Sequence, residues 1–146
     1  MHRFINIDGI ELIKHFEGFS PTIYVCAGGC NTIGYGHKIL SGETFDYLTT
    51  QQAEEMLYKD LRHSEKSVMR YIDVSLGSNQ FAALVSFTFN LGAAALQRSS
   101  LRQKINFGLY EESSDEFLKW KYVGIKVLSG LVKRRIAERS LFLKDL

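Results

Sequence analysis

In a glycine-rich run of this 146-residue chain, residues 17–37, strand-forming residues alternate with tight-turn residues. The Gly28-Gly29 pair suits the turn of a hairpin, because glycine enters the left-handed backbone region without steric cost. Strand formers stand on both sides of that pair: Tyr24, Val25, Thr32, Ile33 and Tyr35. The run predicts a small β-hairpin.

The residues before the run have a helical pattern. Apolar residues recur at helical spacing between Ile10 and Phe16, after a possible N-cap at Asn6 or Asp8. Gly18 is a natural helix stop. This segment therefore predicts a helix whose last residue is Glu17.

The rest of the chain is helical in character. A long helix is expected from Thr49 or Thr50, with a capping box from Thr49 to Gln52, and the apolar residues near 68–72 either extend it or begin a second helix. Residues from Ser78 or Asn79 up to Gly92 are apolar on nearly every side, which is typical of a buried central helix. Shorter helices are expected at 101–107, 115–120 and 130–143. Strands separated from helices in this way predict an α+β fold in one domain, residues 1–146.

Composition and charge exclude several classes of protein. No run is long and apolar enough for a membrane span, and the N-terminus lacks the apolar stretch of a signal peptide. Two cysteines are too few for a disulfide framework or a structural zinc site, so a reducing compartment is the default. Residues 1–118 carry ten basic and fourteen acidic side chains, and residues 119–146 carry eight and two. The basic C-terminal segment is expected to be a solvated helix face, or else a surface that attracts an anionic polymer.

Three side chains in or beside the hairpin have the chemistry of glycosidic bond hydrolysis. Glu17 is a carboxyl group, Cys26 a thiol nine residues on, and Thr32 a hydroxyl six residues beyond that. A hydrolase of this kind needs an acid for the leaving oxygen and a second group that acts on water or on the sugar. A glutamate at a helix end is more often simply solvated, so the residues alone leave the assignment open.

The sequence Glu17-Gly18 followed by Cys26 and by Thr32-Ile-Gly-Tyr-Gly-His37 resembles the catalytic signature of the phage-type lysozymes, the endolysin muramidases of glycoside hydrolase family 24. The resemblance covers roughly residues 8–143 and is closest to the lambdoid-prophage branch, in which a Glu-Cys-Thr set occurs. It implies a lysozyme-like fold, in which a small N-terminal β-hairpin lobe and a larger helical lobe flank a cleft. By the same resemblance Glu17, Cys26 and Thr32 are catalytic, and Lys38, Phe89, Asn90 and Ser100 border the cleft.

Several of these residues also have simpler explanations. Phe89 suits ordinary core packing, Asn90 a helix cap, and Thr32 a plain strand position. Relatives often have Asp where this chain has Cys26, so its role as nucleophile, base or water-positioning group stays open, as does retention or inversion at the anomeric carbon. His37 is expected to be structural.

Three further side chains carry expectations of their own. Cys30 is expected to be a small buried hydrophobe. Whether it forms a regulatory disulfide with Cys26 stays open. Trp120 is expected to pack in the core.

The implied function is hydrolysis of the β-1,4 bond between N-acetylmuramic acid and N-acetylglucosamine in peptidoglycan. The resemblance implies no metal or organic cofactor, no nucleic-acid partner and no stable membrane insertion. It implies a monomer that waits in the host bacterial cytoplasm until a holin or a similar agent opens the membrane. The alternatives are a lytic transglycosylase, a catalytically silent wall-binding or phage structural module of the same fold, and a basic helical nucleic-acid binder.

Overall fold

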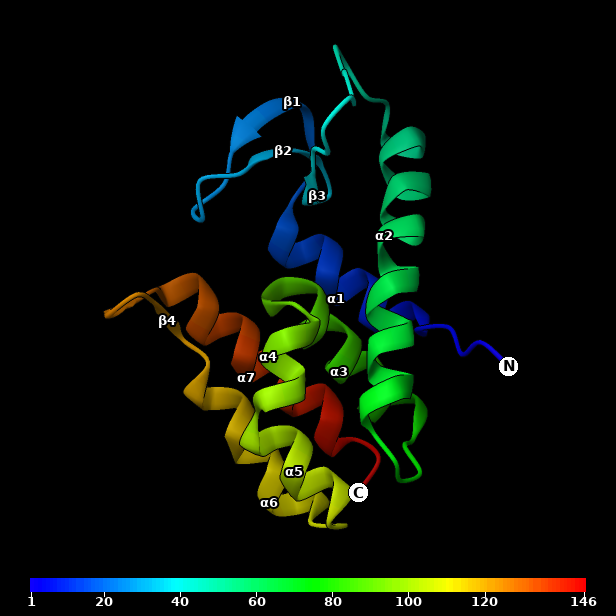
Figure 1. Ribbon diagram of the computed structural model, residues 1–146, viewed down its shortest axis with the longest axis vertical. Coiled ribbons are helices and arrows are strands. Elements are labelled where there is room, and N and C mark those ends of the chain that lie inside the picture. Colours follow the sequence, from blue (N-terminus) through cyan, green and yellow to red (C-terminus); the bar gives the residue numbers. More distant parts are fainter.

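Two lobes joined by one long helix make up the computed structural model, which describes all residues 1–146 (Figure 1). The long helix is α2, Thr50–Tyr71, and it runs past both lobes. A small sheet with a long loop forms one lobe, and helices form the other. The three-stranded sheet is thus separated from the helical lobe, which confirms the expected α+β arrangement.

The small lobe is built on the hairpin that the glycine-rich run predicts. Strands β1, Ser20–Val25, and β2, Asn31–Gly34, pair antiparallel with Tyr24 opposite Thr32, and β3, His37–Lys38, adds to the free edge of β2. Ile33, Leu48 and Ala53 form its small core. Tyr35 lies in the turn between β2 and β3 instead of in a strand. The reason is that Gly34, the last residue of β2, and Gly36 have φ values of 68° and 76°, and this left-handed backbone reverses the chain at Tyr35.

Helix α1, Ile7–Glu17, begins and ends where its caps require. The Asn6 side chain accepts a hydrogen bond from the Gly9 backbone N–H, which satisfies a donor that the first turn leaves free. Gly18 ends the helix with φ 69°. Glu17 is therefore the last helical residue, as expected, and its side chain emerges where the chain turns toward β1.

Helix α2 begins at the predicted capping box, in which Thr49 and Gln52 exchange side-chain and backbone hydrogen bonds. It continues without interruption to Tyr71. Val68 therefore belongs to the same helix as Leu57 and Leu61, and all three are buried. The apolar residues near 68–72 extend this helix; they do not begin another.

Helix α3, Ser78–Leu91, is the buried centre of the helical lobe. Every residue from Gln80 to Thr88 is buried, and the helix packs against α1, α2 and α7, Ser129–Leu143. The prediction of a buried central helix is confirmed. Phe87 on this helix contacts Phe117 and Trp120 edge-on, so Trp120 packs against the core as expected.

The segment between α3 and α7 holds more elements than the sequence predicted. The expected helices at 101–107 and 115–120 are present, the second as a 3₁₀ helix, but two short helices and a two-stranded hairpin were missed. These elements are too short for an apolar pattern to repeat along them, so periodicity does not reveal them. Their bounds are α4, Ala93–Arg98; α5, Ser100–Asn106; α6, Tyr110–Ser114; η1, Asp115–Lys119; β4, Tyr122–Val123; and β5, Lys126–Val127.

Two expectations were wrong. Cys30 is exposed, because it lies at the tip of the β1–β2 hairpin, where nothing packs on it. The basic C-terminal segment is not simply a solvated face, since Arg134 and Arg135 of α7 are buried. Burial is possible because each guanidinium meets carboxylates inside the lobe. No helix of the structure is both long and apolar enough to cross a bilayer.

Candidate active site

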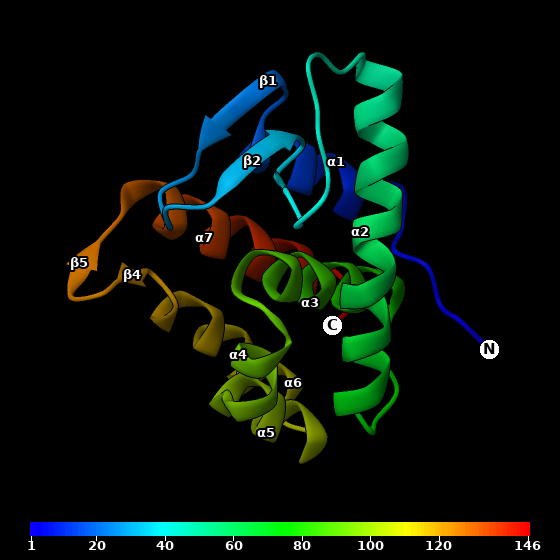
Figure 2. The ribbon, with the colours of Figure 1, turned by 45° about the horizontal axis from the view of Figure 1, so that its top comes forward.

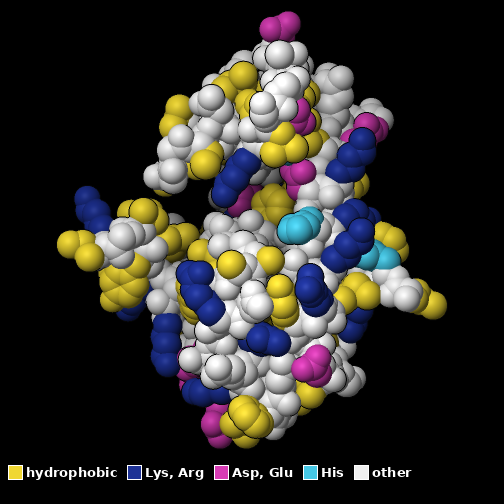
Figure 3. Space-filling model, in the orientation of Figure 1, with side chains coloured by type: hydrophobic (Ala, Val, Ile, Leu, Met, Phe, Trp, Pro, Cys, Tyr) yellow, Lys and Arg dark blue, Asp and Glu magenta, His cyan; other side chains and the backbone are white.

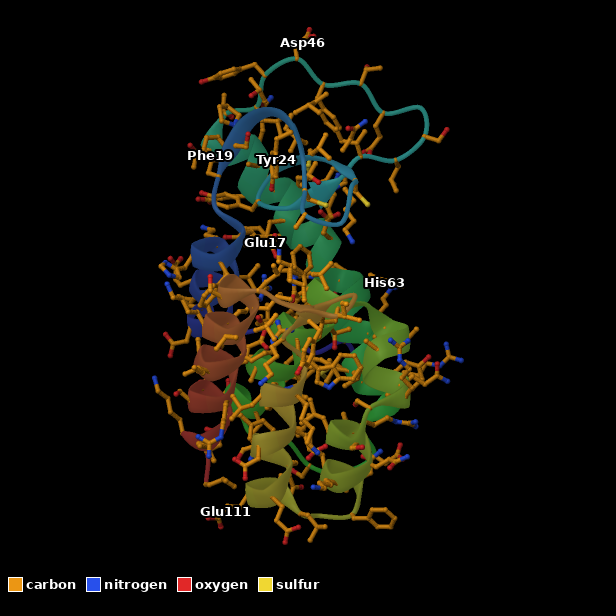
Figure 4. The ribbon with its side chains drawn as sticks, turned by 90° about the vertical axis from the view of Figure 1, so that its left-hand side faces the viewer. Glu17, Phe19, Tyr24, Asp46, His63 and Glu111 are labelled. Atoms are coloured by element: carbon orange, nitrogen blue, oxygen red, sulfur yellow. The ribbon has the colours of Figure 1, made fainter.

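Glu17 lies where the two lobes meet, with Tyr24 and Phe19 of the small lobe above it (Figure 4). Its side chain is partly buried, with 18% of its surface exposed. The β2–β3 turn packs directly on the carboxyl group: a Cβ atom built on Gly36 would come within 2.8 Å of the Glu17 Cδ atom. Glycine is required at position 36 for this close approach as well as for its φ of 76°.

A buried guanidinium holds the other side of the carboxylate. Arg134 Nη1 of α7 donates a hydrogen bond of 2.5 Å to Glu17 Oε2. The Arg134 side chain is only 4% exposed, and its Nη2 also donates to the Ser86 backbone oxygen at 3.3 Å. The carboxyl group of Glu17 is therefore oriented by two segments, α7 and the β2–β3 turn, that lie 98 residues apart, from Gly36 to Arg134.

The ion pair is part of a larger buried network. Glu138 of α7 is completely buried and accepts hydrogen bonds from Arg135 at 3.2 Å and from the Ser86 hydroxyl at 2.5 Å. Burial lowers the pKa of Arg135, and Glu138 opposes that shift. The charges of this network balance, since it contains two guanidinium groups, Arg134 and Arg135, and two carboxylates, Glu17 and Glu138. Removing any one of them leaves an uncompensated charge in the lobe.

The β1–β2 hairpin carries the other two candidate catalytic residues. Cys26 and Cys30 are directly opposite each other at its end, where Cys26 N–H donates to the Cys30 oxygen at 2.9 Å. Thr32 is buried, and its hydroxyl donates to the same Cys30 oxygen, also at 2.9 Å. Because that donor is already used, the lone pairs of the Thr32 oxygen are what remain for another partner.

The Cys26 thiol has an environment that favours ionisation. The backbone N–H of Cys30 donates to Cys26 Sγ at 3.4 Å, and this contact is the main cause of a lowered Cys26 pKa. Burial acts in the opposite direction, but too weakly to cancel it. A lower pKa gives more thiolate near neutrality, and thiolate is the form that acts as nucleophile or base.

The charges of both Glu17 and Cys26 act on the pKa of Tyr24. Partial burial raises the pKa of its phenol, and the negative charges of Glu17 and Cys26 raise it further. Tyr24 pairs with Thr32 across the sheet. The raised pKa keeps the phenol protonated, so it is available as a hydrogen-bond donor.

A hollow separates the two lobes (Figure 3). One cavity of about 250 Å³ is lined from the small lobe by Gly36 and Lys38, and from the helical lobe by His63, Thr88 and Phe89. Lys38 and Phe89 thus face the same space from opposite lobes. A second hollow, of about 360 Å³, is lined by Phe16, the N-terminal turn of α7 and Arg134. Glu17 contacts one lining residue of each, Gly36 and Arg134.

The other two proposed cleft residues line neither hollow. The Asn90 side chain is engaged by the network, since its Oδ1 accepts a hydrogen bond of 2.7 Å from Arg135. Ser100 is exposed at the first residue of α5. His37 is held by carboxylates, with Nδ1 2.7 Å from Asp60 and Nε2 3.0 Å from Glu43, which agrees with a structural role.

Arg134 is the residue at this site that the sequence analysis missed. Arg134 lies in a basic run near the C-terminus, and such runs are usually solvated, as its exposed neighbour Lys133 is. The basic run therefore offered no reason to single out Arg134. The usable signal was the spacing of Arg134, Arg135 and Glu138, which places two cations one turn before an acid on one helix face. Even that signal predicts a local ion pair and gives no reason to expect Glu17 as the partner.

Comparison with known proteins places this geometry in a family. The family model described as phage lysozyme matches residues 14–138. The endolysin of Acyrthosiphon pisum secondary endosymbiont phage 1 is 38% identical over 142 residues, which cover 94% of this chain and 97% of that protein. The endolysin from Escherichia coli O157:H7 phage FAHEc1 has a solved structure that is 31% identical, with a TM-score of 0.90 over 100% of this chain and 97% of the other.

The endolysin of Bacillus phage B103 is 42% identical over 137 residues, which cover 92% of this chain. Only 52% of that protein is matched, so the chain spans about half the length of this relative. The match with the family model nonetheless includes the end of α1, the whole small lobe and the buried α7 network. The chain therefore belongs to the phage lysozyme family.

Proposed function

We propose that the protein is an endolysin-type muramidase that hydrolyses the β-1,4 bond between N-acetylmuramic acid and N-acetylglucosamine in peptidoglycan. The observation that carries the proposal is the placement of Glu17. Its carboxyl group is oriented by Arg134 and Gly36 at the junction of the lobes, beside the hairpin that bears Cys26 and Thr32. The relatives named endolysin support the same activity.

In the proposed mechanism Glu17 first takes up a proton from solvent and then gives it to the leaving glycosidic oxygen. General acid catalysis needs a group fixed within hydrogen-bond reach of that oxygen. The contacts of Glu17 Oε2 with Arg134, and of the carboxyl group with the β2–β3 turn, leave few rotamers open to the side chain. Both contacts reduce the entropy that would otherwise be lost when the substrate binds.

The β1–β2 hairpin carries the groups that act on the attacking water or, on the retaining course, on the anomeric carbon. The Thr32 oxygen, whose own proton is directed to the Cys30 carbonyl, accepts a hydrogen bond from the attacking water. Cys26, with its lowered pKa, takes the proton of that water as a thiolate. On the alternative, retaining course the same thiolate attacks the anomeric carbon directly.

The glycan strand is proposed to lie in the hollow between the lobes. Lys38 and Phe89 line it from opposite sides, one with a charge for carboxylate or hydroxyl groups and the other with an aromatic face. Asn90 and Ser100 are proposed to border the strand further along. For Asn90 this role includes its hydrogen bond from Arg135, which sets the orientation of the amide.

The deciding experiment compares wild type and Glu17→Gln in clearing a suspension of purified peptidoglycan. An amide cannot deliver the proton, so we expect a rate lower by roughly 10²–10⁴. Urea unfolding of the two proteins provides the control for folding. A folded Glu17→Gln protein that clears within tenfold of wild type contradicts the proposal. A wild-type protein that binds peptidoglycan without clearing it identifies a silent module.

Mass spectrometry of the released fragments separates hydrolysis from lytic transglycosylation. A hydrolase adds one water to each cleaved bond, whereas a transglycosylase releases an anhydro sugar. Thr32 and Cys26 are equipped to act on water, so hydrolysed ends are expected. We further propose that the enzyme works as a monomer from the host cytoplasm, and that it reaches the wall after a holin or a similar agent opens the membrane.

A further inference from the structure

The β4–β5 hairpin is an apolar projection that the fold does not use. It extends from the helical lobe between η1 and α7, away from the body of the molecule (Figures 1 and 2). Ile125 at its tip is 99% exposed, and Tyr122, Val123 and Val127 are about half exposed. None of these four side chains joins a hydrophobic core. Polar residues would serve equally well for folding here, so the apolar character needs another explanation.

The hairpin is rigid at its base. Tyr122 pairs with Val127 and Val123 with Lys126 across the two strands, and Leu128 N–H donates to the Lys121 oxygen at 3.1 Å. Gly124 makes the turn with φ 62°. Because successive strand residues point to opposite faces, Tyr122 and Val127 share one face of this ribbon, Val123 lies on the other face beside Lys126, and Ile125 is at the tip.

In the sequence, the only charged residues that flank this apolar tip are cations. No aspartate or glutamate occurs from Phe117 to Ala137, although that stretch contains six lysine or arginine residues. Arg134 and Arg135 are buried, and Lys119 pairs with Glu116 at 2.7 Å. The remaining lysines, Lys121, Lys126 and Lys133, have no carboxylate partner. Figure 3 shows hydrophobic side chains gathered at this edge of the molecule, with basic side chains beside them.

This combination matches one kind of surface. An anionic lipid bilayer accepts aliphatic side chains a few ångströms below its headgroups, holds tyrosine at the interface and attracts lysine through its negative charge. A polysaccharide or a nucleic acid also attracts lysine, but neither offers an apolar interior for Ile125. We propose that the β4–β5 hairpin attaches the protein peripherally to the anionic surface of a phospholipid bilayer. The attachment is independent of the proposed wall hydrolysis.

Co-sedimentation with vesicles tests the proposal. Wild type is expected to bind vesicles of phosphatidylcholine mixed with phosphatidylglycerol, to bind phosphatidylcholine alone much more weakly, and to be released as salt is raised. Ile125→Ser removes the side chain that enters the bilayer and should weaken binding roughly tenfold. Lys126→Glu reverses one charge at the surface and should weaken it by about the same factor or more.

Two matched variants serve as controls. Phe107→Ser removes an equally exposed apolar side chain, 81% exposed, in the turn after α5. Lys66→Glu reverses an exposed, unpaired lysine on α2. Both are expected to bind vesicles like wild type. All four variants are expected to keep the urea midpoint of wild type, and the hairpin variants should still clear purified peptidoglycan, which contains no membrane.

Three outcomes overturn the proposal. The first is wild type that does not bind anionic vesicles, and the second is a loss of binding as large in Phe107→Ser or Lys66→Glu as in the hairpin variants. The third is hairpin variants that bind vesicles normally but sediment less with purified peptidoglycan, which would assign the hairpin to the wall polymer.

Discussion

The two sides of the candidate site are built in opposite ways. On the small lobe, the side chains of Cys26 and Thr32 are each held by one hydrogen bond with the backbone of Cys30, at the exposed end of a hairpin. On the helical lobe, Arg134 reaches Glu17 from a buried network of four charges. A substitution at the exposed end of the hairpin should change the stability of the fold little. A substitution in the buried network should reduce both stability and activity. Substitutions on the two sides should therefore have different effects.

Arg134→Met should have the largest effect, because it removes a buried cation and leaves Glu17 and Glu138 with one positive partner between them. We expect a loss of about 3 kcal/mol in the free energy of unfolding, together with loss of wall clearing. Urea unfolding measures the first. Lys133→Met, its exposed neighbour, is the control and should change stability by less than about 0.5 kcal/mol. Equal stabilities for the two variants would show that the network is not a stabilising unit.

Cys26→Ala should separate activity from stability on the hairpin side. A methyl group neither ionises nor hydrogen-bonds, so clearing should fall roughly 10²-fold while the urea midpoint stays near that of wild type. Cys26→Asp should keep much of the activity, because a carboxylate can accept the same proton. The initial clearing rates of the three proteins across pH give the comparison. Full activity in Cys26→Ala would leave Thr32 alone to organise the water.

Oxidation should reproduce the effect of Cys26→Ala, but reversibly. Cys26 and Cys30 lie at the same end of the hairpin, where Cys26 N–H donates to the Cys30 oxygen and Cys30 N–H donates to Cys26 Sγ, so a disulfide between them should need little backbone movement. Glutathione disulfide can link them by thiol–disulfide exchange, which releases two glutathione molecules. Peptide mapping detects the link, and clearing before and after reductant measures its effect. Cys30→Ser should abolish the sensitivity; a linked protein with full activity would contradict the switch.

Gly36→Ala should have a smaller effect, on both stability and activity, since Gly36 belongs to the small lobe and contacts Glu17. A side chain at φ 76° costs about 1–2 kcal/mol, and its Cβ atom also collides with the Glu17 carboxyl group. Gly42→Ala carries the same φ strain, at 87°, with nothing within 4 Å. Both variants should lose stability, but only Gly36→Ala should lose clearing activity by tenfold or more. Equal activities would mean that the turn does not position Glu17.

His37 should give the smallest effect, visible as a pH dependence of stability. Burial lowers the pKa of His37, but Glu43 and Asp60 outweigh burial, so the net pKa is raised. The folded state therefore binds the proton more tightly than the unfolded chain. The resulting stability is present below about pH 6.5 and is lost as pH rises through the raised folded value. Urea unfolding from pH 5 to 9 should show this loss in wild type and not in His37→Gln. His15→Gln, which removes a histidine without a carboxylate partner, should keep it.

Local signals predicted most of the elements that build the site. The caps at Asn6 and Thr49, the stop at Gly18 and the Gly28-Gly29 turn each act within a few residues, and the helices and hairpin they bound were found. The elements missed, α4, α6 and β4–β5, have six residues or fewer. Segments this short are held by neighbours in space, so their own residues carry too little pattern to reveal them.

The sequence by itself predicted the candidate chemistry of this protein, because an acid, a thiol and a hydroxyl at fixed spacing around a glycine-rich turn can be recognised in the chain. It also predicted where the helix that carries Glu17 begins and ends, and where the hairpin that carries Cys26 and Thr32 turns. Only the tertiary structure decided that Arg134 faces Glu17, that Arg135 is buried and that Cys30 is exposed. The physical reason is that the sequence around a charged residue does not show whether its side chain is solvated or buried in an ion pair. Its state depends on what a distant segment places beside it.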